Sequence, residues 1–388
     1  MGDGKLVHVV YDRFDDVPRE DWARLCANSS ITLSRRFWQT IENSKMQDIA
    51  CKYIVFYHHD LPVALIPFCK IRTDLAIFSA AFLKNILSFI RKAVPNFFKI
   101  NIAECGSPVT INTPQFLIDN NIDKSEFLID LKKILTRLSI RERCLMMIIR
   151  DFEIDQEVGE YRKGLTGLGF SWLPSLPNTY LAVRWTCIDE YHEAMRSHYR
   201  HKLFKHLNIN KNNKITHELV DDFSDLSGEL CRQWHVVHEK AKELKREVLT
   251  PEFYAEISQN MGPDSKALLF YSEGQLLGHV LLLKDGDLLR WLYVGRNISE
   301  RDSLYYYIIH KIIETAISIG ARKVEMGLTT YHIKQDFGAQ LVPIYIAIRL
   351  TIPFFNPLLS PLYNFLHKSE QYPTKRVFKE EAVARLKG

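Results

Sequence analysis

A polar insert between two strand-like segments carries the side chains best suited to chemistry in this sequence. The insert, GLTTYHIKQDFG at residues 327–338, places Tyr331 and Lys334 three residues apart, so a helix would bring both to one face. Gly327 and Gly338 stand where the backbone needs conformational freedom. A tyrosine can donate a proton to a leaving group, and a lysine can hold an oxyanion or a phosphate. A surface helix with a solvated lysine and a half-packed tyrosine is the alternative.

A loop that could bind an anion follows a predicted strand. The segment VGRNISERDS, residues 294–303, combines a glycine, two arginines and the start of a predicted helix. Exposed amides and the helix dipole favour negative charge at such a place, and Arg296 and Arg301 would add to it. The segment therefore predicts a site for the phosphates of a donor. An ordinary loop with solvated arginines is the alternative.

A second basic segment, residues 195–216, contains Arg196, Arg200, Lys202 and three further basic residues but no acid. A helix face of one sign indicates an anionic partner, such as the phosphates of a cofactor, of tRNA or of a lipid surface. The alternative is a basic surface helix beside acidic neighbours. Residues 82–99 and 350–366 also mix apolar and basic character, and we expect them to pack on the protein rather than lie on a membrane.

Metal and disulfide chemistry are not indicated. The paired histidines come without further ligands at zinc spacing, so we expect no metal. The seven cysteines are odd in number, widely spaced and without a C-x-x-C motif, which disfavours a disulfide framework and favours a reducing cytoplasm. P-loop, G-x-S-x-G and G-x-G-x-x-G motifs are also missing.

The length and the order of elements predict two similar domains. A chain of 388 residues exceeds the usual size of one core, and its 46% hydrophobic and 25% charged residues are ordinary for a globular protein. Residues 53–68 align without a gap to residues 267–282, and both read as a strand, a turn and a strand. Each is followed by more strand, a long helix and another strand, which indicates a repeated fold.

The motifs at both ends of the second half resemble those of one transferase group. GARKVEMGLTTYHIKQDFGAQ, residues 320–340, resembles the G-x-x-x-x-x-x-G…Y-x-x-K-x-x-F-G segment of the FemAB-like and CelD/BioF2-like acetyltransferases of the GNAT superfamily. MRSHYRHKLFKHL, residues 195–207, resembles their S-x-x-Y-R-x-K-L segment. ITLSRRFWQTIENS, residues 31–44, resembles their N-terminal helix entry. The resemblance implies an α/β fold with mixed (α+β) sheets, built from two tandem GNAT-like acyl-CoA N-acyltransferase domains.

The resemblance also implies a division of the chain. Residues 1–180 would form an N-terminal GNAT-like domain, and residues 181–350 a C-terminal GNAT-like domain with the donor site. Residues 351–388 would form a proline-spaced tail with apolar and basic residues. Carried over to matching positions, the motifs point to Tyr331, Lys334, Phe337, Gly338, Tyr199, Arg200 and Lys202.

The predicted reaction is attack of an amine on a thioester or ester carbonyl. A backbone N–H of residues 290–294 would polarise the carbonyl, Tyr331 would protonate the leaving group, and His279 and Glu325 are candidate bases. Lys334 would bind donor phosphates together with the rest of the predicted donor-binding set, which is Arg200, Lys202, Tyr293, Val294, Arg296, Asn297, Arg301 and Ser303.

The donor and the setting are open at this stage. The R/Q-x-x-G-x-G/A loop of ordinary acetyl-CoA enzymes is replaced by GRNISERDS, which leaves longer acyl-CoA, acyl carrier protein or aminoacyl-tRNA as donors to a small-molecule amine. Cell-envelope, polysaccharide, lipid or secondary-metabolite biosynthesis would suit such a reaction. A Fem-type aminoacyl-tRNA-dependent transferase and a membrane-surface or scaffold protein with a degenerate GNAT fold are the alternatives. We expect a cytoplasmic protein, with peripheral contact to the inner face of the membrane as an option.

Overall fold

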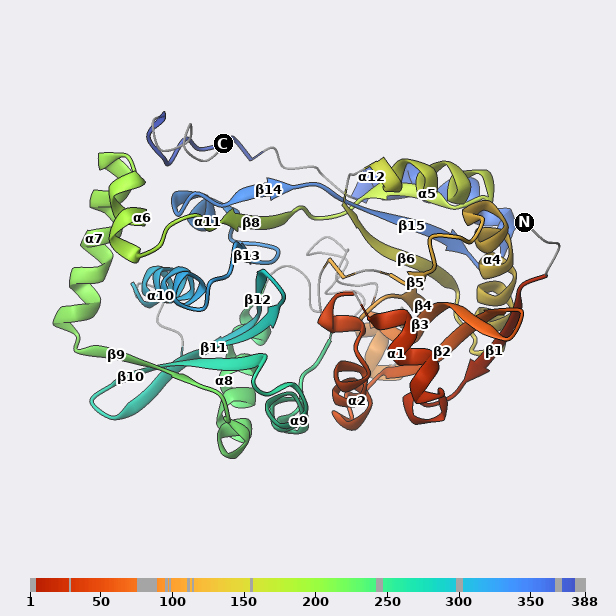
Figure 1. The fold of residues 1–388 in the computed structure, drawn as a ribbon, viewed down its shortest axis with the longest axis horizontal. Helices are drawn as coiled ribbons and strands as arrows, with labels where there is room; N and C mark the ends of the chain where they lie inside the picture. Colours follow the sequence, from red (N-terminus) through yellow and green to blue (C-terminus); the bar gives the residue numbers. More distant parts are fainter. Residues whose placement is uncertain are drawn as a thin grey trace.

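The computed structural model describes residues 5–27, 29–74, 89–94, 97, 99–109, 112–113, 115–153, 156–241, 247–297, 303–366 and 372–380. Two mixed sheets lie next to each other, each covered by helices (Figure 1). The first sheet has the order β1-β2-β3-β4-β6-β15-β7, and β5 pairs with β3. Its strands are β1 (Val7–Tyr11), β2 (Ile49–His58), β3 (Leu61–Asp74), β4 (Lys99–Cys105), β5 (Leu117–Ile118), β6 (Met146–Glu153), β7 (Ser171–Pro174) and β15 (Ile344–Leu350).

The second sheet has the order β14-β8-β13-β12-β11-β10-β9. Its strands are β8 (Asn178–Ala182), β9 (Ile215–Val220), β10 (Ser265–Ser272), β11 (Gln275–Asp285), β12 (Leu288–Arg296), β13 (Lys323–Glu325) and β14 (Gln340–Val342). Each sheet contains one parallel pair, β4 with β6 and β12 with β13. A long helix lies between the two strands of each pair in the chain, because a parallel connection has to cross back over the sheet.

The helices form the outer layers of both sheets. The α-helices are α1 (Arg19–Cys26), α2 (Arg35–Asn43), α4 (Lys124–Arg141), α5 (Gln156–Gly167), α6 (Ile188–Ala194), α7 (Ser197–Asn212), α8 (Ser227–Lys240), α9 (Pro251–Met261), α10 (Leu304–Ser318), α11 (Tyr331–Asp336) and α12 (Leu359–Leu366). Short 3-10 helices are η1 (Phe14–Asp16), η2 (Ile31–Leu33), η4 (Ser224–Leu226) and η5 (Pro353–Leu358). The long helices predicted before β6 and before β13 are therefore present as α4 and α10.

The internal repeat seen in the sequence is a repeat in the structure. Residues 53–68 lie on the β2–β3 hairpin, and residues 267–282 lie on the β10–β11 hairpin. The strand register shifts between Phe56 and Tyr57 in one hairpin and between Phe270 and Tyr271 in the other. These residues are the ones that the gap-free alignment superimposes, so the two hairpins share a bulge as well as a sequence pattern.

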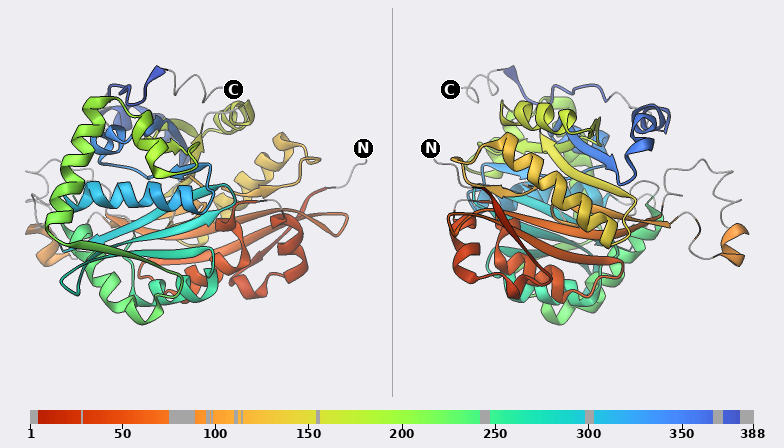
Figure 2. Two further views of the ribbon diagram at one scale, coloured as in Figure 1. Left: turned by 60° about the vertical axis from the view of Figure 1, so that its left-hand side comes forward. Right: turned by 90° about the vertical axis from the view of Figure 1, so that its right-hand side faces the viewer.

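Three apolar cores hold the layers together. One core packs α4 and α5 on the first sheet, and another packs α6, α7 and α10 on the second sheet, as the left view of Figure 2 shows for α10. The third core is common to both sheets. It includes Phe37 and Trp38 of α2, Phe253 and Ile257 of α9, and Leu269 of β10. Because this core is continuous, the two sheets are packed as one body through α2 and α9.

Sheet membership does not follow the order of the chain. After β14 the chain leaves the second sheet, and β15 enters the first sheet between β6 and β7. β8, which begins at Asn178, already belongs to the second sheet. The domain boundaries at residues 180 and 350 stay a prediction. β15 lies in the range predicted for the C-terminal domain, but it pairs with strands of the first sheet.

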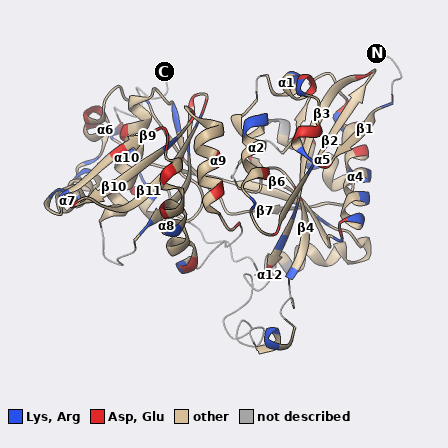
Figure 3. Cartoon of the chain, turned by 90° about the horizontal axis from the view of Figure 1, so that it is seen from below, with Lys and Arg blue, Asp and Glu red and all other residues tan. Residues whose placement is uncertain are grey.

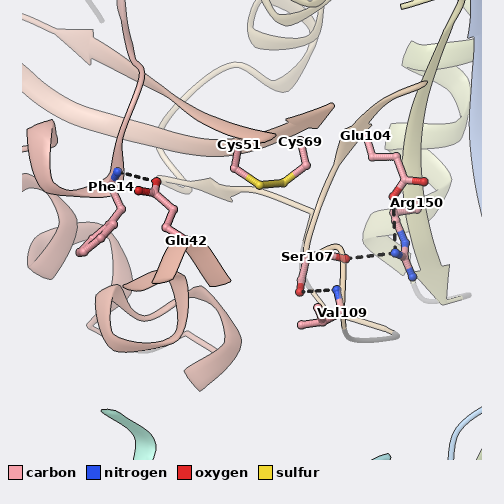
Figure 4. Close-up of a disulfide and its surroundings, with 8 residues drawn as sticks. All are labelled: Phe14, Glu42, Cys51, Cys69, Glu104, Ser107, Val109 and Arg150. Atoms are coloured by element: carbon pink, nitrogen blue, oxygen red, sulfur yellow. Dashed lines mark hydrogen bonds and ion pairs between the residues drawn. A yellow bond between two sulfur atoms is a disulfide. The ribbon is translucent and has the colours of Figure 1, made fainter. Parts of the chain in front are cut away.

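Two expectations need correction. Cys51 and Cys69 stand directly opposite each other on β2 and β3 and form a disulfide, with Cα atoms 4.1 Å apart (Figure 4). The spacing of cysteines along the chain gave no sign of this disulfide, because the pairing depends on strand register.

Packing against the protein was also expected for the two apolar–basic segments, residues 82–99 and 350–366. However, Phe354 is 83% exposed and Phe89 is 73% exposed. Residues 82–88 of the first segment lie outside the described residues. Among the described residues, no helix combines the length and apolar character needed to cross a bilayer.

Candidate active site

The second sheet opens between its two parallel strands. β12 extends from Leu288 to Arg296, but it pairs with β13 only as far as Arg290, which stands opposite Glu325. The chain then turns away, and the N–H of Met326 donates to the carbonyl of Thr179 on β8 at 2.8 Å. The backbone of β12 beyond Arg290 therefore has no partner strand on this side within the described sheet.

The first sheet has no such opening at the equivalent place. There β4 pairs with β6 up to its last residue, Cys105, which stands opposite Ile149. The next residue, Gly106, has a φ of +118°, and the side chain of Arg150 lies 3.3 Å from the position that a Cβ would take. The two domains thus share a topology, but the described strands separate in the second one.

A bulge lies in β12 at the opening. Leu281 and Leu282 of β11 stand opposite Tyr293 and Trp291, so Leu292 is the extra residue. Bulges bend a strand and re-aim its side chains. Here Leu292 and Tyr293 both pack toward the core under α8 and α9, whereas Trp291 packs toward α10. The indole N–H of Trp291 donates to the carbonyl of Tyr293 at 3.2 Å, which gives that backbone oxygen a partner.

The polar insert folds as the short helix α11 beside this opening. Gly327 has a φ of +70° and Gly338 a φ of +89°, so both glycines adopt the left-handed conformation that their positions suggested. Lys334 is only 2% exposed, and its Nζ donates to the carbonyls of Gly327 at 3.0 Å and Leu328 at 2.9 Å. The same Nζ lies 5.5 Å from the ring centroid of Trp291.

Burial changes the protonation of Lys334. Loss of hydration lowers the pKa of Lys334 to about 7, and the nearby Glu325 carboxylate offsets part of this effect. A lysine with such a pKa can be neutral or charged near physiological pH. Because an opposite charge raises a lysine pKa, a negatively charged ligand in the opening would favour the ammonium form.

Tyr331 lies on α11 but makes different contacts from Lys334. It is 3% exposed, its hydroxyl donates to the carbonyl of Pro177 at 2.9 Å, and its ring lies 4.5 Å from that of Tyr372. Thr330 to Ile333 and Tyr372 line an open hollow of about 410 Å³. The role of Tyr331 as a proton donor stays a prediction.

The two candidate bases are held by buried hydrogen bonds. Glu325 accepts from Arg290 Nη1 and from Asn178 Nδ2, the latter at 2.8 Å, and burial raises the pKa of Glu325. His279 is fully buried between the hydroxyl of Tyr254 and the amide oxygen of Gln233, both at 3.0 Å. Burial lowers the pKa of His279 to about 3, so this imidazole is neutral at physiological pH.

The predicted donor-binding residues divide into two groups. Arg296, with its neighbour Asn297, lies at the end of β12, and its guanidinium stands 5.4 Å from the ring centroid of Tyr305 on α10. Ser303 precedes α10, and its hydroxyl is 2.8 Å from Nδ1 of His206 on α7. Tyr293 and Val294 follow the bulge on β12, and Val294 stands opposite Val280 of β11. Arg301 lies outside the described residues.

The other group is on α7, which carries basic residues at the left edge of Figure 3. Lys202 Nζ donates to Asp336 Oδ2 of α11 at 2.6 Å, and Lys375 Nζ donates to Asp336 Oδ1 at 2.5 Å. Burial opposes ionisation of Asp336, but the two lysines outweigh it and lower the Asp336 pKa. Arg200 lies half-buried on the same helix. Lys202 thus connects α7 to the helix that bears Lys334.

The sequence patterns missed two aromatic residues at the opening. Trp291 and Tyr305 lie with ring centroids 5.9 Å apart, between β12 and α10. In the sequence they looked like ordinary strand and helix core residues, and their position depends on the bulge. Within the described residues, no three His, Cys, Asp or Glu side chains are grouped as metal ligands would be.

Several solved structures share this architecture. The structure of FemX superimposes with a TM-score of 0.55 and 12% sequence identity, and the match covers 90% of this chain and 98% of that one. L-PGS from Bacillus licheniformis gives a TM-score of 0.52 with 10% identity, covering 89% and 96%. A tandem GNAT protein from the clavulanic acid biosynthesis pathway gives 0.51 with 10% identity, covering 89% and 99%. The chain therefore has the fold of these structures, which include a tandem GNAT protein, as its sequence predicted.

Sequence comparison adds curated relatives of the same name from two strains of Mycobacterium tuberculosis. No protein-family model matches the chain. A Mycobacterium tuberculosis protein named "Putative 8-amino-7-oxononanoate synthase 2" is 24% identical over 333 residues, which are 84% of this chain and 43% of the relative. The chain thus spans less than half the length of this relative.

Proposed function

We propose that the protein is an N-acyltransferase that moves an acyl group from a thioester to an amine. The observation that carries this proposal is the opening between β12 and β13, next to the bulge at Leu292 and the buried Lys334. An extended thioester could lie along the unpaired part of β12 and use its free backbone groups. The donor would be an acyl-CoA or an acyl carrier protein, and its acceptor a small-molecule amine.

Each group at the opening has a part in this reaction. A backbone N–H between Trp291 and Val294 would donate to the thioester oxygen as it gains negative charge. Lys334 would stabilise the same charge or a donor phosphate, and Tyr331 would return a proton to the leaving thiolate. Arg296 would bind phosphates at the start of α10. Holding donor and amine together accounts for much of the rate increase in such a transfer.

The proposal is tested by release of free thiol. Acetyl-, hexanoyl- and dodecanoyl-CoA are each incubated with the protein and n-propylamine, and free CoA is measured. We expect release that depends on both the protein and the amine for at least one chain length. If none of the three acyl-CoAs is consumed, acyl-CoA is contradicted as the donor. Binding of the protein to anionic vesicles under the same conditions would then support a membrane-surface protein without acyltransferase activity.

Aminoacyl-tRNA is the second candidate donor, because α7 presents basic residues and has no acid along its length. Phosphate-directed binding of this kind weakens steeply as salt is added. Transfer that is abolished by ribonuclease and is strongly salt-dependent would replace the acyl-CoA proposal.

A further inference from the structure

A carboxyl group not used so far lies on the other face of β12 from Lys334. Glu247 Oε1 is 2.5 Å from the hydroxyl of Tyr293, the residue that follows the bulge. Tyr293 belongs to the core under α8 and α9, whereas Trp291, which contacts Lys334, belongs to the core under α10. Glu247 therefore approaches the opened strand from the face that the proposed donor side chains do not occupy.

The hydroxyl of Tyr293 has one proton and two close neighbours. The second is the carbonyl oxygen of Val109, also at 2.5 Å, which can only accept. If Tyr293 donates to Val109, its contact with Glu247 is a hydrogen bond only when Glu247 carries the proton. If Tyr293 donates to Glu247, the hydrogen bond stabilises the ionised carboxylate. Tyr293 can therefore stabilise both protonation states of Glu247, as a group that accepts and releases a proton requires.

The surroundings of Glu247 suit this task. Burial raises the pKa of Glu247, although the hydrogen bond from Tyr293 and the charge of Arg150 act in the opposite direction. A carboxyl group with a raised pKa takes up a proton more readily near neutral pH. Glu247 and Tyr293 both keep part of their residue surface exposed to solvent. The candidate bases His279 and Glu325 are each held by two hydrogen bonds inside the protein.

The first sheet supplies the opposite wall of this region. Arg150 donates to the carbonyl of Ser107 at 3.0 Å, near Val109 (Figure 4). Arg150 also pairs with Asp151 at 2.8 Å. Thr113 is 3% exposed, and among the described residues its hydroxyl has no hydrogen-bond partner.

We propose that the acceptor is a primary amine that enters between the two sheets as an ammonium ion and passes one proton to Glu247. This inference rests on the proposed acyl transfer. The neutral nitrogen attacks the thioester carbonyl carbon, the new C–N bond forms and the C–S bond breaks. Tyr331 gives its proton to the thiolate, which leaves as a thiol, and regains a proton from the nitrogen. One ammonium ion and one thioester thus give one amide, one thiol and one proton, which Glu247 releases to water.

Glu247→Gln tests the proton transfer, because glutamine keeps the size and hydrogen bonding of the side chain but cannot accept the proton. An alkylamine, like a lysine side chain, is almost wholly protonated at neutral pH, whereas hydroxylamine is already neutral. With n-propylamine we expect thiol release to fall by at least about 100-fold, within the range for a lost general base. With hydroxylamine we expect a loss of less than about tenfold, since no proton has to be removed first.

The matched control is Glu252→Gln, the same change at an exposed position in the first turn of α9. It should leave release with both nucleophiles unchanged. An equal loss with both nucleophiles in Glu247→Gln would show a structural role and overturn the proposal, as would no loss with n-propylamine.

A second measurement does not depend on turnover. The thermal midpoint is compared in propylammonium chloride and in tetramethylammonium chloride, which has no proton to donate. Binding to the folded state raises the midpoint, so propylammonium should stabilise the wild-type protein more, and this difference should vanish in Glu247→Gln. Equal midpoints for the wild-type protein would overturn the ammonium site even if no acyl-CoA is consumed. Amine binding without thiol release would support this inference and contradict the proposed function. Thiol release without amine binding would support the proposed function and overturn this inference.

Discussion

Replacing Lys334 with methionine should lower kcat/KM for amine-dependent thiol release by about 10²- to 10³-fold, the loss typical of removing one donor to a developing oxyanion. Lys334 Nζ is buried beside the unpaired part of β12, 5.5 Å from the ring centroid of Trp291. Charge interactions are stronger in such surroundings than in water. A negatively charged donor would also keep the lysine protonated, although burial alone lowers its pKa to about 7.

Methionine keeps most of the length and the apolar stem of the lysine, so the protein should remain folded. Circular dichroism and the thermal midpoint check this. Lys311→Met is the matched control on α10, where the largely buried Lys311 pairs with Glu314 at 2.5 Å. Lys311 has no part in the proposed reaction, so the kcat/KM of this variant should stay within about twofold of the wild-type value. Unchanged turnover in a folded Lys334→Met protein would remove Lys334 from the mechanism.

Arg290→Met should lower the free energy of unfolding by about 3–5 kcal/mol, the usual cost of leaving buried charges without their partner. Arg290 is 5% exposed, and it bonds both Asp285 at 2.8 Å and Glu325. Its guanidinium also donates to the carbonyl of Asn112 at 3.3 Å and to Ser30 Oγ at 3.4 Å. The variant therefore leaves two carboxylates unpaired and removes contacts that join the two halves of the chain.

Urea denaturation measures this effect, with Arg322→Met as the control. Arg322 pairs with Asp287, but both side chains are largely exposed, so we expect a change below about 0.5 kcal/mol. The double variant Arg290→Met/Glu325→Met should recover part of the lost stability, because it removes one of the stranded charges. A loss below about 1 kcal/mol in Arg290→Met would contradict a structural role for this buried network.

Local patterns in the sequence predicted the elements well. The aligned hairpins at residues 53–68 and 267–282 are β2–β3 and β10–β11, down to a shared shift in register. The alternation of apolar residues and the turn signals are local, so they could be read without the fold. The glycines at 327 and 338 were likewise predictable, because only a special backbone conformation explains two of them around a short helix.

Features that depend on pairing between distant strands were not predictable. The bulge at Leu292 and the end of β13 at Glu325 are properties of hydrogen-bond register, which apolar periodicity does not encode. The same reason applies to β15, which enters the first sheet, and to the disulfide of Cys51 with Cys69. Lys334 was identified by its motif, but its burial required the tertiary structure. Glu247 stood in a charged segment and could be recognised only by its contact with Tyr293.

Hydrogen–deuterium exchange with and without hexanoyl-CoA tests most directly whether the donor binds at the opening of the second sheet. Binding there should slow exchange of the amides in β12 beyond Arg290, in residues 326–330 and in the first turn of α10, because the donor would cover or pair with them. Exchange in β4 and α4 of the first sheet should not change. Protection confined to β4 and α4, or no protection at a saturating concentration of hexanoyl-CoA, would contradict a donor site between β12 and β13.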